Sequence, residues 1–171
     1  ETIKDDLLLY EQVVTQVVYG RPDNGISQEE AKKTLQDYDE AIDSSHRRIL
    51  ALTTERVSTQ QRQQQLDGVE TARWVASVAR AKLLSDDEPG VADQQAIIDL
   101  LEPLLTANVK LADRTRRTGY LLLAAAYRAL DEMDQVASVM NFALKDFPGD
   151  EAIIAESGDA WAAAGNLFRA Y

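Results

Sequence analysis

A pattern of apolar and small residues occurs twice in the last third of this 171-residue chain, with the second copy 34 positions after the first. Each copy has a small residue followed three positions later by an aromatic residue. The two copies are Tyr120-x2-Leu123-Ala124-x2-Tyr127 and Ile154-x2-Ser157-Gly158-x2-Trp161. In packed helices, small residues let the helix axes approach, and large aromatic side chains fill the space beside them. The repeat therefore predicts pairs of packed helices.

The residues between the two copies predict a second helix in the same unit. Asp131 to Asp134 supply a turn with acidic groups that suit the start of a helix. Pro148-Gly149-Asp150 then ends that helix and starts another. Apolar residues between these signals recur at spacings of three and four, namely Val136, Val139, Met140, Ala143, Leu144 and Phe147.

This arrangement resembles the tetratricopeptide repeat, a helix–turn–helix unit with the pattern W-x2-L-G-x2-Y, a later Ala and a terminal Pro. Ala143 and Pro148 occupy the last two positions, whereas Tyr120 and Ile154 replace the usual Trp and Ser157 replaces Leu. The resemblance is clear over about 117–171, degenerate over 69–107 and absent over the first 66 residues. It implies an all-α fold in which antiparallel helix pairs stack as a short right-handed solenoid.

In this repeat class the first helices of successive units line a concave, protein-binding groove. Carried over by position, the groove residues here are Leu121, Ala125, Arg128, Ala155, Asp159 and Ala162. Some family members hold a partner's C-terminal carboxylate with Lys, Asn and Arg, but only Arg128 is basic here, so that activity is not carried over. The small side chains suit an apolar helix with anchors at spacings of three and four. That helix comes either from a partner or from the first segment of this chain.

The first 66 residues are expected to form an N-terminal helical hairpin packed on the rest. Residues 2–19 have an amphipathic helical pattern, and a break follows at Gly20 to Gly25. Ser27-x2-Glu30 has the form of a capping box, which predicts a long helix with a heptad-like apolar stripe up to Leu52. Beyond Leu52 we expect either a protruding helix, with the Gln60 to Gln65 run on a solvated face, or a break near Thr53.

The middle of the chain predicts a degenerate helix pair. Asp67-Gly68 is expected to start a separate helix over 69–84, followed by an acidic loop over 85–90. The next helix, over 91–107, should be kinked by Pro103, whose ring removes a hydrogen bond and clashes with the preceding turn. Residues 67–171 then form helical repeats, in one continuous domain with residues 1–66.

Composition limits the classes of partner. The net charge of −11 argues against nucleic acid and anionic lipid, because both need a basic face. The chain has no Cys, and no apolar run approaches the roughly 18 residues of a membrane span. We therefore expect a soluble protein, with cytoplasm and periplasm both open. Because the chain begins with Glu1, an N-terminal segment is expected to have been removed.

The residues predict no enzyme, no cofactor and no metal site. His46 is the only histidine and lies beside two arginines, which is typical of a surface residue. No phosphate-binding loop, nucleophile elbow or distinctive carboxylate pair is present. The basic cluster Arg114, Arg116 and Arg117 is expected to pair with acidic residues of the same chain; the alternative is a docking point for an acidic tail.

The sequence thus predicts a non-enzymatic scaffold or adaptor that binds a protein or peptide. One alternative is a structural homo-oligomer, formed through the heptad stripe or the uncapped C-terminal end. Another is a sensor or regulatory domain from a larger receptor. If the repeat register is correct, Tyr127 and Trp161 should be largely buried at equivalent places.

Overall fold

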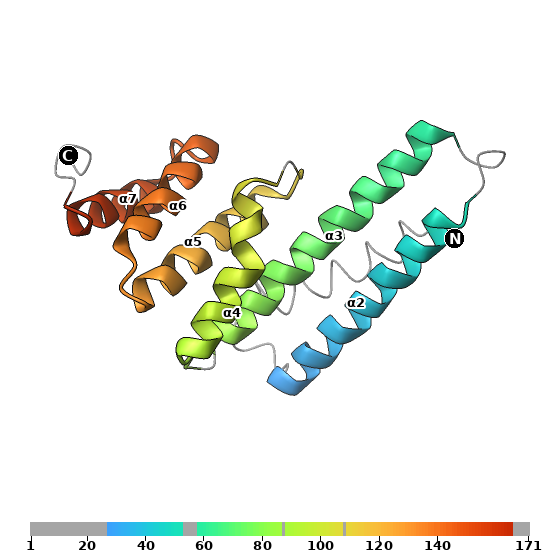
Figure 1. Ribbon diagram of the computed structural model, residues 1–171, viewed down its shortest axis with the longest axis horizontal. Coiled ribbons are helices and arrows are strands. Elements are labelled where there is room, and N and C mark those ends of the chain that lie inside the picture. Colours follow the sequence, from blue (N-terminus) through green and yellow to red (C-terminus); the bar gives the residue numbers. More distant parts are fainter. Residues whose placement is uncertain (1–26, 53–57, 87, 108, 166–171) are drawn as a thin grey trace. The chain divides into compact units, whose positions relative to one another are not determined.

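The computed structural model describes residues 27–52, 58–86, 88–107 and 109–165, and this part of the chain is helical without any strand (Figure 1). The predicted all-α class is therefore confirmed. The expected helix over 2–19 and the break after it lie outside the described residues. The helices are α2 (Gln28–Leu50), α3 (Thr59–Ser85), α4 (Val91–Leu101), the 3₁₀ helix η2 (Glu102–Leu105), α5 (Asp113–Ala129), α6 (Met133–Asp146) and α7 (Glu151–Ala163).

The chain divides into two compact units. Unit 1 comprises residues 1–83 and 108–111, and unit 2 comprises residues 84–107 and 112–171. The boundary expected at residue 66 falls inside α3.

In unit 1, α2 begins where the capping signal predicted. The Ser27 hydroxyl accepts a 3.2 Å hydrogen bond from the Glu30 N–H, which satisfies one of the free donors at the helix start. The helix ends at Leu50, and α3 starts at Thr59. A helix break in this region is one of the two expected alternatives. The buried residues of α2 are those of the predicted stripe, namely Ala31, Leu35, Tyr38, Ile42, Ser45 and Ile49.

The α3 helix runs without interruption through Asp67 and Gly68, so the predicted break there is wrong. Gly68 costs a helix about 1 kcal/mol relative to Ala, which the rest of a 27-residue helix absorbs. Asp67 is also held within the helix, because its side chain accepts from Gln63 and its carbonyl accepts from Thr71. A turn dipeptide therefore does not end a helix when its neighbours favour helix on both sides.

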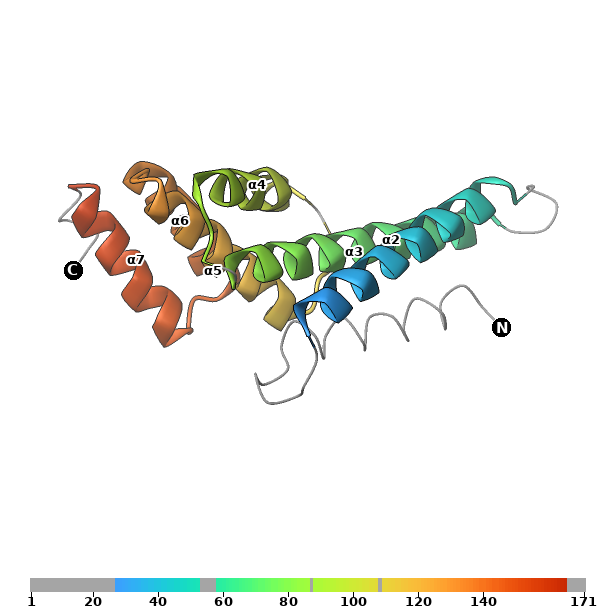
Figure 2. The same cartoon turned by 90° about the horizontal axis from the view of Figure 1, so that it is seen from below.

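The helices α2 and α3 run side by side in unit 1 (Figures 1 and 2). Their direction is antiparallel, because Asp39 pairs with Arg80 while the later Asp43 pairs with the earlier Arg73. The glutamine-rich start of α3 is largely exposed, and its second half joins an apolar core with α2. His46 is half-buried beside Arg73, with 3.2 Å between its Nδ1 and the arginine Nη2.

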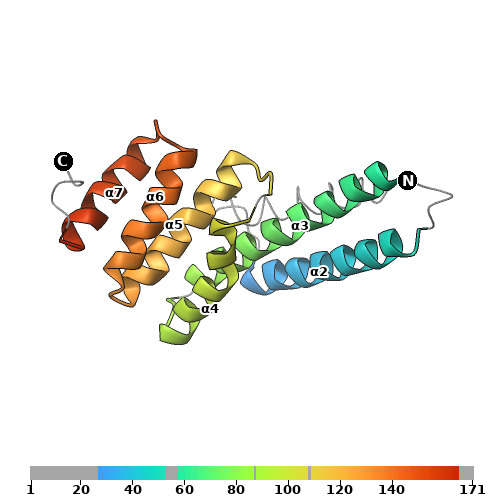
Figure 3. The same ribbon diagram turned by 45° about the horizontal axis from the view of Figure 1, so that its top comes forward.

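In unit 2, each helix packs on the next: α4 on α5, α5 on α6, and α6 on α7. Figure 3 shows α5, α6 and α7 as neighbours. The expected kink at Pro103 takes the form of a change in helix type, because α4 ends at Leu101 and a 3₁₀ turn follows. Proline lacks the N–H that an α-helix would need there.

The turn between α5 and α6 has a left-handed residue that is not glycine. Asp131 has φ of 62°, its N–H donates to the Arg128 carbonyl over 3.0 Å, and the Glu132 N–H donates to the Tyr127 carbonyl over 2.9 Å. These two bonds form a Schellman motif, which normally has glycine at the left-handed position. The motif reverses the chain sharply and makes α5 and α6 an antiparallel hairpin.

Candidate functional site

The repeat register places its aromatic residues differently in the two copies. Tyr120 and Tyr127 on α5 are 2% and 4% exposed, as predicted for core positions. On α7, Ile154 corresponds to Tyr120 but is 48% exposed, and Trp161 is only partly buried. The expectation of a largely buried residue is thus confirmed for Tyr127, whereas Trp161 is of intermediate exposure. Among the described helices α7 has its main packing on α6, and Ile154 and Trp161 lie partly outside that packing.

The start of α5 is fixed to the end of α6 by a shared carboxylate. Asp146 Oδ2 accepts from Tyr120 Oη over 2.6 Å and from Arg116 Nη1 over 3.0 Å. The Tyr120 ring also meets Phe147 edge to face, with 6.4 Å between the ring centroids. Arg116 thus pairs within the chain, as expected for the basic cluster.

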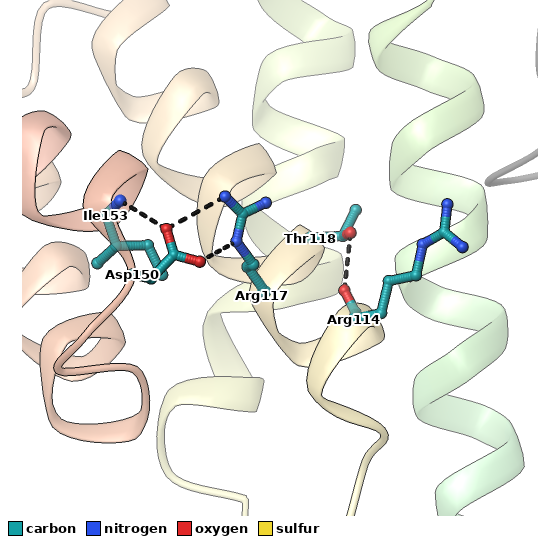
Figure 4. A network of polar contacts seen from close by, with 5 residues as sticks. All are labelled: Arg114, Arg117, Thr118, Asp150 and Ile153. Atoms are coloured by element: carbon teal, nitrogen blue, oxygen red, sulfur yellow. Dashed lines mark hydrogen bonds and ion pairs between the residues drawn. The ribbon is translucent and has the colours of Figure 1, made fainter.

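Arg117, in the second turn of α5, reaches the start of α7 (Figure 4). Its Nε and Nη2 donate to the two oxygens of Asp150 over 2.6 Å and 3.2 Å. Asp150 is the N-cap of α7, and its Oδ1 also accepts from the Ile153 N–H over 3.1 Å. In the same view the Arg114 side chain points away from Asp150. One carboxylate therefore joins the two helices and begins the second one.

A second ion pair joins the same two helices further along, between Arg128 and Glu156. The partners advance along both helices, from Arg117 and Asp150 to Arg128 and Glu156, so α5 and α7 run parallel. Parallel first helices are what a stack of helix hairpins produces. The two pairs therefore connect α5 and α7 through their long side chains.

The six predicted groove residues all lie toward solvent on these two helices. Leu121 is half-buried, and the others are exposed: Ala125, Arg128, Ala155, Asp159 and Ala162. We name these six residues the α5–α7 face. Arg128 is held by Glu156, a residue that the sequence argument did not select. The repeat pattern assigns positions one at a time, so it cannot predict an ion pair between residues 28 positions apart in the sequence.

The shared carboxylates have shifted pKa values. Burial opposes ionisation of Asp146, but the hydrogen bonds from Tyr120 and Arg116 outweigh it and lower the Asp146 pKa. The hydrogen bonds from Arg117 and from the Ile153 backbone lower the pKa of Asp150. Both groups are therefore held in the charged form that their partners require.

The two tyrosines of α5 have pKa values raised to about 12. Burial is the main cause for both, and the hydrogen bond to a carboxylate adds to it. For Tyr127 that bond goes to Glu102 Oε1 over 2.9 Å, with the charges of Glu132 and Asp99 nearby. Each hydroxyl therefore acts as a donor that fastens α5 to a neighbouring element, α6 or η2.

The negative charge of the chain belongs mostly to unit 2. By sequence this unit has fifteen acidic and six basic side chains, a formal charge of −9 out of the chain's −11. Within the described part, Arg116, Arg117 and Arg128 all pair with acidic residues of unit 2. Unit 2 therefore presents a strongly negative potential to any partner.

No protein-family model, curated protein or solved structure matches this chain. The likeness to tetratricopeptide repeats thus stays a prediction from the residues. Across the ranges that the structure describes, no helix is both long and apolar enough to cross a membrane, and no group of three acidic or histidine side chains is placed to hold a metal ion.

Proposed function

We propose that unit 2 is a non-enzymatic protein-binding module of the tetratricopeptide class, a short right-handed solenoid whose α5–α7 face takes a helix from a partner. The observation that supports this most is the pair of ion pairs between α5 and α7. They connect two parallel helices, with exposed small residues on both. A face with fixed spacing binds a ligand at a lower entropic cost than one that must be ordered on binding.

The chemistry of the face indicates an apolar helix as its ligand. Ala125, Ala155 and Ala162 offer no hydrogen-bonding group and let a backbone approach closely. Arg128 is engaged by Glu156, so no arginine of the face is available to clamp a terminal carboxylate. We expect cationic residues beside the apolar anchors of the partner, because unit 2 is strongly acidic.

Substitution of Ala125 tests the proposal. A helical peptide selected from a displayed library by binding to the wild-type chain is titrated against three proteins: wild type, Ala125→Glu and Ala92→Glu. Ala92 is an equally exposed alanine of unit 2 on α4. We expect Ala125→Glu to keep its helical circular dichroism and to bind at least about tenfold more weakly, with no change for Ala92→Glu. Equal binding by Ala125→Glu and wild type would place the site elsewhere.

A second candidate is self-association through the other exposed side of α7. Ile154 and Trp161 lie seven positions apart, so they share a side that differs from the one with Ala155 and Ala162. Ile154 is 48% exposed, and the buried indole nitrogen of Trp161 has no hydrogen-bond partner among the residues that the structure describes. Light scattering across dilution separates the candidates. Self-association predicts a mass that rises with concentration and returns to the monomer value in Ile154→Glu.

A further inference from the structure

Few of the side chains that α7 buries are large, although the helix packs closely along α6. In the described part of the chain, α7 buries Ile153, Ser157 and Ala160, and only Ile153 is large. The Ser157 hydroxyl donates to the Ile153 carbonyl over 2.6 Å, so this hydrogen bond lies within α7. The preceding helix, α6, buries five apolar side chains, namely Val136, Ala137, Val139, Met140 and Ala143.

Besides its packing on α6, α7 is attached to α5 by charged contacts. The Arg117–Asp150 and Arg128–Glu156 pairs connect α7 to α5, and all four side chains are partly exposed, between 24% and 39%. Partly exposed ion pairs are weakened by salt, which screens charges, whereas buried apolar contacts are not. The attachment of α7 is therefore of a different kind from that of α6.

Asp150 couples two events that are usually separate. Its Oδ1 accepts from both the Ile153 N–H and Arg117 Nη2. The first bond caps α7, and the second docks α7 on α5. When the Arg117–Asp150 ion pair breaks, the capping carboxylate loses the positive charge beside it. When the first turn of α7 frays, the Asp150 carboxylate is no longer held in position to bind Arg117.

The position of the opening is set by a second carboxylate. Asp146 stays fixed to α5 through Arg116 and Tyr120, and the Phe147 ring packs on Tyr120. The connection that is left is Pro148-Gly149, and a Cβ added at Gly149 would meet nothing within 4 Å. Because Gly149 has no Cβ, its backbone can adopt more conformations than that of any other residue type.

We propose that α7 is a detachable helix: it opens at Pro148-Gly149 as a unit while α4, α5 and α6 stay folded, and the Arg117–Asp150 pair controls how often it opens. Such local opening is typical of elements with few buried apolar contacts. The α5–α7 face has its fixed spacing only while α7 is docked, and the inference does not depend on what that face binds.

Hydrogen exchange of the full chain, followed by mass spectrometry at neutral pH, tests the inference. Wild type should exchange faster over 151–163 than over α5 and α6, and this difference should grow between about 0.1 M and about 1 M salt. Asp150→Asn keeps a capping side chain but removes its charge, and Arg117→Gln removes the other partner. Each should raise exchange of α7 alone by a few-fold.

Two further variants separate the ion pair from the cap. The double variant Arg117→Gln/Asp150→Asn should exchange no faster than either single one, because both remove the same interaction. Asp150→Ala removes the cap as well and should raise exchange of α7 by roughly tenfold. Arg80→Gln, which breaks the ion pair to Asp39 in unit 1, is the control and should leave α7 unchanged.

The inference is overturned if α7 exchanges at the same rate as α5 and α6 in wild type. It is also overturned if Arg117→Gln accelerates all helices of unit 2 equally. Either result would mean that α7 opens only when the whole unit unfolds.

Discussion

Tyr120 and Asp146 are joined by a 2.6 Å hydrogen bond that links the first half of α5 to the last residue of α6. A short bond from a phenol to a carboxylate is charge-assisted and is stronger than a bond between neutral groups. It fixes the antiparallel hairpin at the end opposite its Schellman turn. The hairpin is thus held at both ends by polar contacts and between them by apolar packing.

Removing the Tyr120 hydroxyl should weaken unit 2. In Tyr120→Phe the ring contact with Phe147 remains, so the change isolates the hydrogen bond to Asp146. We expect a loss of about 1–2 kcal/mol in the free energy of unfolding, measured by urea titration. A loss below about 0.3 kcal/mol would show that Arg116 alone satisfies the carboxylate.

Alkaline pH should destabilise the fold. The pKa values of Tyr120 and Tyr127 are raised from 10.0 to about 12 in the folded protein. In the unfolded chain both phenols ionise near the ordinary value, so the unfolded state loses protons first. Stability is therefore complete below about pH 10 and falls as pH rises towards about 12. Urea titrations at increasing pH should show this decline, and it should be smaller in the variant Tyr120→Phe/Tyr127→Phe.

Low pH should also destabilise the contact between α5 and α6. The pKa of Asp146 is lowered from its ordinary value of 3.8, so the folded state favours the charged form. This contribution is present above the unfolded pKa and is lost as pH falls through the folded pKa. Below about pH 5, the free energy of unfolding should fall less steeply with decreasing pH in Asp146→Asn than in wild type. An unchanged pH dependence in this variant would assign the acid sensitivity to other carboxylates.

Replacing Asp131 by glycine should stabilise the protein. Asp131 has φ of 62°, a region that glycine adopts without the steric cost that a Cβ brings. We expect Asp131→Gly to gain up to about 1 kcal/mol, seen as a higher melting temperature. Asp131→Ala removes the same charge without relieving the backbone and should lower the melting temperature. If both variants are stabilised equally, the gain comes from charge and not from backbone conformation.

Replacing Gly68 by alanine should also stabilise the protein, in this case in unit 1. The residue lies within α3, and a Cβ there would meet nothing within 4 Å. We expect a gain of about 0.5–1 kcal/mol from the higher helix propensity of alanine. Urea titration measures it, and a loss would contradict a continuous α3.

The sequence was sufficient for features that depend on neighbours along the helix. The α2 stripe from Ala31 to Ile49 follows from the spacing of apolar residues, and the Ser27 cap follows from local chemistry. The Asp67-Gly68 prediction failed because a turn signal was read without the helix-forming residues around it. Local propensity is a sum over many residues, and one glycine changes it little.

Contacts between helices could be predicted only as a class. The pairing of Arg116 and Arg117 with acidic residues of the chain was expected, but their partners were not. Asp146 and Asp150 lie 30 and 33 positions later, and which carboxylate meets which arginine depends on how α6 returns past α5. The α5–α7 face was likewise chosen by analogy, which could not show that Glu156 holds Arg128.

The two ion pairs between α5 and α7 require a fixed number of residues in α6. One extra residue in α6 would advance the start of α7 by about 1.5 Å and rotate it by about 100°. Asp150 would then point away from Arg117, and Glu156 would lose Arg128 in the same step. An insertion or deletion between Glu132 and Asp150 should therefore break both ion pairs.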